Sequence, residues 1–558
     1  MDYIFQKRKY GLFVHFVHEL SCHSDGSLPQ GMEETVNGFD VEGFADAVAS
    51  TGAEYLILTA WHAKALPLYK SAVTEKYRGI KLPERDLLGE IIAAITARGI
   101  DMLLYTHPRD GHDFSPEDKL ACGWGADIEG DKPDAQSFDY QKWNKYTLAL
   151  YSELLERYGD QLCGIYTDGT GPYNNKSQRY EKTLQVLDYT KLRNLIKHKN
   201  PKLCMIQNHF GYLFSDDFEM PEGYFGFEND HFEDMRAIPA AKKALAICPF
   251  KGGWWPIEKT ARGYDATMTT AAELARFAIF NASCTVGGGV CFASGPYCEG
   301  DLFPCGVIEQ LSEVGALLRA RRESVLDAVP SRSYPTLSGD TLQGLGGRCF
   351  TESRDGEYAY LHILDPRSAL ELKLPLPEDG ATLHKPVSLS SMLRITAFSH
   401  EGDHYRLVLS GALDAVDSVI RFSRTQKAEK VLEWINDSDK RLHYEGDWKY
   451  VFLMQAKETH TALGAFESDY HVASSKGSAA FTYFEGSFVA VYGNKRPGNG
   501  SAQIYIDGVL SGELCENGAD ERRTCLFSSI DLCGGVHTLY IVTDSDAPFE
   551  LDAIEIIA

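Results

Sequence analysis

Basic residues are scarce in this chain of 558 residues: 55 lysines and arginines stand against 79 aspartates and glutamates, which gives a net charge of -24. An acidic surface of this kind repels the phosphates of nucleic acids and of anionic lipids, so we expect neither nucleic acid nor a membrane as partner. The sequence also has no apolar run long enough to cross a bilayer. A chain of this length is expected to fold into about two to four domains.

Motifs for metal ions and cofactors are missing as well. The 13 cysteines include no Cys-x-x-Cys pair, no His-Glu-x-x-His motif occurs, and no Gly-Lys-Ser or Gly-Lys-Thr follows the glycines at 287–289. These absences argue against a structural zinc site, a metalloprotease site and a phosphate loop. We therefore expect no metal and no cofactor. The N-terminus lacks the apolar core of a signal peptide, so we expect a cytoplasmic protein, or a secreted or periplasmic one if a signal peptide has been removed.

Short apolar runs in the first half of the chain each lead to residues that can take part in chemistry. Such runs, separated by amphipathic stretches, are typical of parallel strands buried on both faces. A (β/α)8 barrel builds its active site at the C-terminal ends of its strands. The pattern therefore predicts an α/β catalytic domain, a (β/α)8-like barrel, over residues 1–328. The runs lead to His15, to Trp61 and His62, to Tyr105 and His107, to Asp168, and to Asn208 and His209.

Helix and strand patterns alternate through this region and change beyond it. We expect helices at 40–51, 86–98, 140–158, 180–198, 270–282 and 306–321, and strands at 55–59, 102–105, 162–168, 203–207 and 246–250. Alternation of period two then predicts an all-β part. It comprises an antiparallel β-sandwich over 329–425 and a jelly roll over 426–558.

The order of several motifs resembles the α-L-fucosidases of glycoside hydrolase family 29, from Lys9 to about Arg424. The similar segments are Lys9-Tyr-Gly-Leu-Phe-Val-His15, 52–62, Gly164-Ile-Tyr-Thr-Asp-Gly169, Asp217-Phe-Glu-Met-Pro-Glu222 and 292–296. The family also has a β-sandwich after its barrel. The last part of the chain is similar to galactose-binding-like jelly rolls at 505–509 and 551–555, which suggests a carbohydrate-binding-like module.

The resemblance implies a retaining, exo-acting glycosidase that removes a terminal α-L-fucose or a related sugar. Such chemistry needs a carboxylate nucleophile and a carboxylic acid that acts as acid and base. It implies that Asp168 is the nucleophile and that Glu222 is the acid/base, with Glu228 as the runner-up. The expected sugar-binding residues are His15 and His62 as hydrogen-bond donors, Tyr105 and Tyr166 as pocket walls, Trp61, Trp254 and Trp255 as an apolar wall, and also His209 and Glu228.

Two departures from the family pattern affect the expected sugar pocket. Ala63 and Lys64 follow His62 where the family has a second histidine and an aspartate, and Asn208 is followed by His209 rather than leading to an arginine. We expect an oligosaccharide or glycoconjugate glycan as substrate, with the sugar and the linkage left open, and self-association also stays open. The alternative is a non-catalytic glycan-binding protein on a decayed glycosidase barrel. Another barrel enzyme, such as a lyase or isomerase, has no motif in its favour.

Overall fold

The structure is a computed structural model of the chain. It describes residues 7–129, 132–134, 136–168, 186–207, 218–219, 246–249, 270–284, 290–336, 342, 344–425, 432–452, 465, 469–529, 532 and 536–557. These residues form two compact units. One holds a parallel sheet and its helices up to Arg322, and the other holds antiparallel sheets from Glu323 onward together with 282–284.

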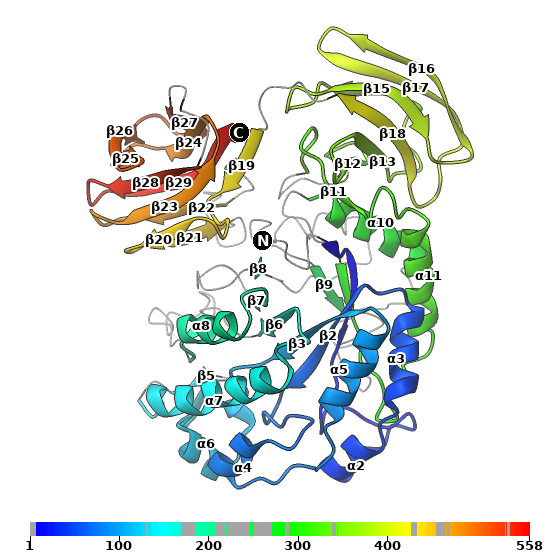
Figure 1. Cartoon of the computed structure of the whole chain (residues 1–558), viewed down its shortest axis with the longest axis vertical. Helices are drawn as coiled ribbons and strands as arrows, with labels where there is room; N and C mark the ends of the chain where they lie inside the picture. The colour runs from blue at the N-terminus through cyan, green and yellow to red at the C-terminus, as the bar shows by residue number, and fades with distance from the viewer. Residues whose placement is uncertain are drawn as a thin grey trace. The chain divides into compact units, whose positions relative to one another are not determined.

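An eight-stranded parallel sheet forms the centre of the first unit (Figure 1). The first strand, β1, pairs in parallel with both β2 and β10, the last strand of the unit. Pairing between the first and last strands is a property of barrels, so the expected barrel-like architecture is confirmed. The spatial order is β8 (Phe218–Glu219), β7 (Cys204–Gln207), β6 (Gly164–Thr167), β3 (Asp101–Thr106), β2 (Tyr55–Trp61), β1 (Tyr10–Val14), β10 (Val290–Ala293), β9 (Ala246–Pro249).

The central strands are buried along their length, which explains their continuous apolar runs. All residues of β1 and β2 are buried, as expected for strands covered on both faces. Gly11 of β1 lies opposite Tyr55 of β2. A Cβ atom added at Gly11 would come within 2.1 Å of the Tyr55 ring. A glycine is therefore required for the tyrosine to lie across β1.

Four helices of the first unit have an aspartate as their N-cap residue. In α3 (Val41–Ser50), α5 (Leu87–Ala97), α7 (Tyr140–Tyr158) and α8 (Tyr189–Lys199), the N-cap aspartate accepts a hydrogen bond from the amide three residues later. This cap satisfies an amide that has no partner within the helix. It also corrects one expectation: the helix expected from residue 180 begins only at Tyr189, because Asp188 caps it. The helices α10 (Ala271–Ala282) and α11 (Val307–Arg319) lie close to the expected ranges.

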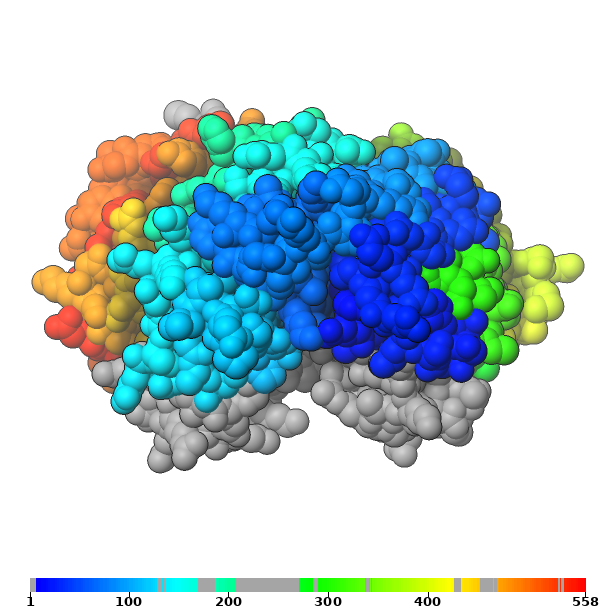
Figure 2. Space-filling view, turned by 90° about the horizontal axis from the view of Figure 1, so that it is seen from below, coloured from blue at the N-terminus to red at the C-terminus, as the bar shows by residue number. Residues whose placement is uncertain are grey.

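Shorter helices fill the connections after β1, β2 and β3. They are α2 (Met32–Asn37), α4 (Ala72–Arg78), the 3-10 turn η1 (Asp110–Asp113) and α6 (Pro116–Cys122). The helices α2, α4 and α6 lie at the lower end of the unit in Figure 1, and Figure 2 looks onto that end. Because these helices follow the C-terminal ends of the strands, this end is where a barrel places its active site.

The second unit is built from antiparallel sheets, which confirms the expected all-β part. Two sheets enclose one apolar cluster that includes Leu361, Leu407 and Phe422. Their strands are β11 (Ala328–Pro330), β12 (Arg348–Ser353), β13 (Tyr358–Ile363), β18 (Ser418–Thr425) and β15 (Thr382–Ser388) in one sheet, and β14 (Glu371–Pro375), β17 (His404–Gly411) and β16 (Leu393–Glu401) in the other.

A second pair of sheets encloses another apolar cluster, which includes Val491, Ile504 and Ile554. One sheet contains β21 (Lys449–Phe452), β22 (Asp469–Ala473), β29 (Phe549–Ile557), β24 (Phe488–Lys495), β27 (Glu521–Ser528) and β19 (Leu432–Asn436), and the other contains β20 (His443–Glu445), β23 (Ala479–Glu485), β28 (Val536–Thr543), β25 (Ser501–Ile506) and β26 (Val509–Cys515). The division of the chain into three domains at the expected boundaries stays a prediction. Among the described residues, no helix is both long and apolar enough to cross a membrane.

Candidate active site

Four polar residues each stand one position after the end of a strand of the parallel sheet. They are His15 after β1, His62 after β2, His107 after β3 and Asp168 after β6. These four strands are successive neighbours in the sheet. Parallel neighbours end at the same edge, so the four side chains come from one edge of the barrel.

Aromatic rings connect these residues into one cluster. The ring of Tyr105 lies edge-on to His15, with 4.9 Å between centroids, and 5.6 Å from the ring of His62. The same tyrosine stacks on Tyr166 at 5.4 Å. Phe13 packs against His15, Tyr105 and Tyr166. The structure therefore brings together five of the expected site residues: His15, His62, Tyr105, Tyr166 and, through the contact described next, Asp168.

Asp168, the expected nucleophile, is held by Tyr105. The Tyr105 hydroxyl donates a hydrogen bond to Oδ2 of Asp168 over 2.6 Å, and the carboxylate is half-buried. Burial raises the pKa of Tyr105 well above its usual value, and the charge of Asp168 raises it further. Tyr105 therefore stays protonated at neutral pH and acts as a donor to the carboxylate.

Tyr105→Phe is expected to lower kcat/KM by about 10- to 150-fold. A hydrogen bond to a charged group contributes about 1.5–3 kcal/mol, and the rate changes tenfold for every 1.36 kcal/mol. Steady-state kinetics on a hydrolysed glycoside give the measurement. Tyr158→Phe serves as the control, because that tyrosine hydroxyl donates to Asp86 at the start of α5 rather than to Asp168. Equal kcat/KM values for Tyr105→Phe and the unmodified chain would contradict the role of Tyr105.

The hydrogen bonds of His15 decide which of its nitrogens carries the proton. Nδ1 of His15 lies 3.0 Å from Oγ1 of Thr59, and the Thr59 hydroxyl donates its single proton to the carbonyl of Val14 over 3.1 Å. Nδ1 of His15 must then donate to Thr59. A neutral imidazole protonated on Nδ1 carries its lone pair on Nε2. In this tautomer Nε2 of His15 can accept a hydrogen bond, and the donor role toward a sugar that the sequence suggested stays a prediction.

Burial keeps His15 neutral. It lowers the pKa of His15 well below the usual value of 6.5; the nearby His62 and His107 act in the same direction, and Asp168 acts against them. The unfolded chain therefore takes up a proton at this residue that the folded chain does not. The resulting contribution to stability is present above pH 6.5 and is lost as the pH falls below it.

His15→Gln is consequently expected to flatten the pH dependence of stability. One proton changes the free energy of unfolding by at most about 1.4 kcal/mol per pH unit. Thermal midpoints measured between pH 7.5 and 4.5 should fall less steeply in His15→Gln than in the unmodified chain. Parallel curves for His15→Gln and the unmodified chain would disprove a neutral buried His15.

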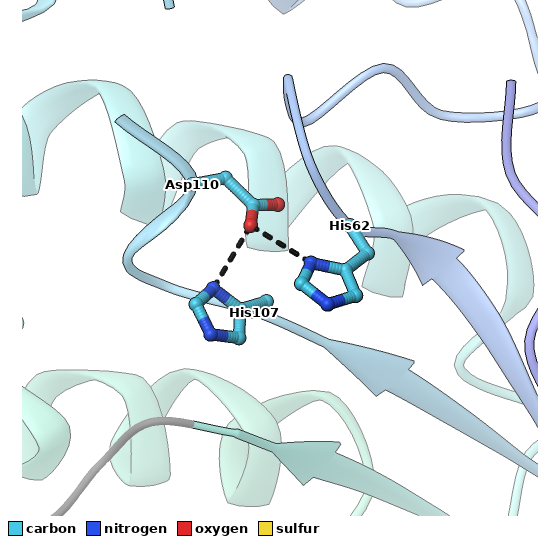
Figure 3. Close-up of side chains that lie close together, drawn as sticks. All are labelled: His62, His107 and Asp110. Atoms are coloured by element: carbon cyan, nitrogen blue, oxygen red, sulfur yellow. Dashed lines mark hydrogen bonds and ion pairs between the residues drawn. The ribbon is translucent and has the colours of Figure 1, made fainter. Parts of the chain in front are cut away.

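A second group of side chains lies beside Tyr105 and joins His62 to His107 and Asp110, which were not among the expected site residues. Asp110, on η1, is 2% exposed, and its Oδ1 lies 3.1 Å from Nδ1 of His62 and 2.8 Å from Nδ1 of His107 (Figure 3). The sequence marks His107 as the residue that ends the third apolar run, but nothing local shows that Asp110 turns back to it. Contacts across the sheet edge decide that arrangement.

Trp61 does not join the cluster. The strands β2 and β3 pair Thr59 with Tyr105 and then Trp61 with Thr106, so β2 has one extra residue at this point. A bulge of this kind turns the following side chain to the other face. Thr59 therefore contacts His15, whereas Trp61 packs against Tyr151 of α7, with 5.0 Å between ring centroids, and is 1% exposed.

Ala63 and Lys64, which depart from the family pattern, directly follow His62 in the chain. Lys64 forms an exposed ion pair with Glu19, with 2.7 Å between Nζ and Oε1. Its neighbour Ala63 has a positive φ of 52°, which is unusual for a residue with a side chain. The other expected residues lie outside the described residues: His209, Glu222, Glu228, Trp254 and Trp255.

Comparison with known proteins agrees with this architecture. The α-L-fucosidase family model matches residues 31–321. A solved structure of a family 29 α-L-fucosidase from Bacteroides thetaiotaomicron, trapped as a covalent intermediate, aligns with a TM-score of 0.53. It is 15% identical and covers 75% of this chain and 95% of its own. At this identity the likeness concerns the fold alone.

Curated relatives match only partly. An α-L-fucosidase of Dictyostelium discoideum is 22% identical over 296 residues, which are 53% of this chain and 57% of that protein. An A-type blood α-D-galactosamine galactosaminidase of Flavonifractor plautii is 30% identical over 108 residues, 18% of this chain and 10% of that protein. The matched part of this chain thus corresponds to between a tenth and just over half of the length of these relatives. Because the family model covers more than half of the chain, and the parallel barrel-like sheet agrees with it, the chain belongs to the α-L-fucosidase family of glycoside hydrolases.

Proposed function

We propose that this chain is a retaining, exo-acting glycosidase that releases a terminal α-L-fucose or a related sugar from glycans. In this proposal Asp168 is the nucleophile and Glu222 is the acid/base. The observation that carries it is the carboxylate of Asp168 at the end of β6, held at 2.6 Å by the hydroxyl of Tyr105. It stands at the edge of the sheet where barrel enzymes carry their reacting groups.

The reaction proceeds in two displacements. One oxygen of Asp168 attacks the anomeric carbon while the bond to the leaving oxygen breaks, and Glu222 gives that oxygen its proton. Water then attacks the anomeric carbon, Glu222 takes the proton from this water, and the bond to Asp168 breaks. The covalent intermediate trapped in the Bacteroides thetaiotaomicron enzyme supports this course for a relative with the same fold.

The side chains around Asp168 favour a ligand rich in hydroxyl groups. Nε2 of His15 can accept a hydrogen bond from a sugar hydroxyl, because Nδ1 is committed to Thr59. Tyr105 and Tyr166 present stacked rings next to the carboxylate. Burying a sugar here costs little only if its hydroxyl groups find such partners.

A panel of p-nitrophenyl glycosides tests the proposal. We expect weak turnover of p-nitrophenyl α-L-fucoside and faster turnover of a substituted, branched or different sugar, since Ala63 lacks the hydrogen bond of the family's histidine, which is a loss of about 1–3 kcal/mol. The panel should include an α-D-galactosaminide, because one relative is a galactosaminidase. NMR of the first-formed product should show the anomer of the substrate.

Other outcomes of the panel have clear meanings. High turnover of the simple fucoside, equal to that of any glycan tested, would show that other residues replace the lost contact. No turnover of any glycoside, together with calorimetric binding of an intact glycan, would favour the alternative of a glycan-binding protein on a decayed barrel. The change at Ala63 is the observation that keeps this alternative open.

A further inference from the structure

Two imidazoles and a carboxylate converge beside the candidate active site. His62 comes from the end of β2, His107 from the end of β3 and Asp110 from η1 (Figure 3). One ligand atom from each lies within 4.8 Å of the other two. Two histidines and one carboxylate are a common ligand set of catalytic zinc sites and of other transition-metal sites.

Nδ1 of His62 takes part in two hydrogen-bond contacts that a single ring nitrogen cannot satisfy at once. The amide of Ala63 donates to Nδ1 of His62 over 2.7 Å, so in this arrangement that nitrogen carries a lone pair. Oδ1 of Asp110 lies 3.1 Å from the same nitrogen. Two lone pairs at this distance repel each other unless a proton or a cation lies between them. A cation bound to both atoms removes the repulsion, and it replaces the amide of Ala63 on Nδ1.

The carboxylate of Asp110 is a second, independent sign of a missing positive charge. Asp110 is 2% exposed, and its Oδ2 has no hydrogen-bond partner among the described residues. A buried carboxylate oxygen that has lost its water and gained no partner is unfavourable. A divalent cation bound to Asp110 supplies a positive charge to this buried carboxylate.

The backbone holds these side chains in place. Ala63 and Ala65, one and three residues after His62, have positive φ angles of 52° and 47°. Strained residues of this kind gather at functional sites. On the other side, Gly111 of η1 lies under two indoles: an added Cβ would come within 2.4 Å of Trp124 and 2.7 Å of Trp143. The turn that carries Asp110 is therefore tightly packed, as a preformed binding site requires.

We propose that His62, His107 and Asp110 bind a divalent transition-metal ion, with zinc the best match. Calcium and magnesium prefer ligand sets made of oxygen atoms only. With three protein ligands, such an ion keeps a position open for water or for a substrate hydroxyl. The ring of Tyr105 lies 5.6 Å from the ring of His62, and its hydroxyl holds Asp168. The ion therefore lies one side chain away from the carboxylate of Asp168, where it can bind a substrate hydroxyl.

Metal content and affinity test this proposal without any substrate. The 558-residue chain, free of any histidine tag, is stripped with a chelator and titrated with Zn²⁺, Co²⁺, Mn²⁺ and, without oxygen, Fe²⁺. We expect one ion per chain, and visible absorption bands of Co²⁺ in a site with nitrogen ligands. His107→Ala and the isosteric Asp110→Asn should each weaken binding by more than about 100-fold, the upper end of the loss for outer partners of a metal ion.

His112→Ala is the matched control, because His112 lies on the same turn as Asp110 but outside the cluster. It should bind the ion as tightly as the unmodified chain. The proposal is overturned if no tested ion binds at one per chain, if binding survives Asp110→Asn, or if His112→Ala loses it. Glycoside hydrolysis is not measured in this experiment. A chain that binds no metal can therefore still be a glycosidase, and a chain without glycosidase activity can still bind the metal.

Discussion

Asp168→Ala is expected to abolish glycoside turnover while the thermal midpoint stays nearly unchanged. The substitution removes the oxygen that forms the bond to the anomeric carbon, and loss of an enzyme nucleophile lowers kcat by about 10⁴-fold or more. Folding is little affected because Asp168 is half-buried at the edge of the sheet. Steady-state kinetics and thermal unfolding of the same preparations give the two measurements.

Rescue by azide tests whether Asp168→Ala has lost the nucleophile. A small anion can enter the space left by the carboxylate and attack the anomeric carbon, so added azide should restore part of the activity and yield a glycosyl azide. Asp160→Ala is the matched control. Asp160 follows the end of α7, is exposed and forms an ion pair with Lys199. An Asp168→Ala enzyme that keeps most of its activity would remove Asp168 from the mechanism.

Glu222→Ala is expected to lower kcat/KM for the hydrolysis of natural glycans by about 10²–10⁴-fold, the usual contribution of a general acid. The kcat/KM for activated aryl glycosides should fall much less, because p-nitrophenolate leaves without needing a proton. Comparison of kcat/KM on both substrate types gives the measurement. In a substrate complex the carboxyl groups of Glu222 and Asp168 should lie about 5–5.5 Å apart.

Glu228→Ala tests the other candidate for the acid/base. Both glutamates lie outside the described residues, and the choice of Glu222 rests on the similarity of Asp217-Phe-Glu-Met-Pro-Glu222 to the family. The acid/base is Glu228 if Glu228→Ala slows the hydrolysis of natural glycans but not that of aryl glycosides, and if Glu222→Ala leaves the hydrolysis of natural glycans unchanged.

Elements with strong local signals could be predicted from the sequence. The helix expected at 140–158 occupies those residues, and α3 and α5 begin directly after Asp40 and Asp86, the first residues of the expected ranges. Strand ends were also predictable: His15, His62 and Asp168 stand where their apolar runs end. Capping and periodicity act over three or four residues, so a single stretch of sequence contains them.

Side-chain roles that depend on neighbours far away in the chain could not be predicted in this way. The hydrogen bond of His15 joins it to Thr59, which is 44 residues away in the sequence. Trp61 is turned toward α7 by one extra residue in β2, a feature that depends on the pairing with β3. Apolar character alone does not show which face of a strand such a residue will occupy.

The sequence by itself determined the alternation of strands and helices, the later change to antiparallel sheets, and the residues at which the strands of the barrel end. It could do so because burial imposes a period on each element that neighbouring residues must follow. Only the tertiary structure decided that Tyr105 holds Asp168, that Asp110 joins His62 and His107, and that Trp61 lies elsewhere. These contacts join different strands and turns, and their geometry arises only when the sheet edge is assembled.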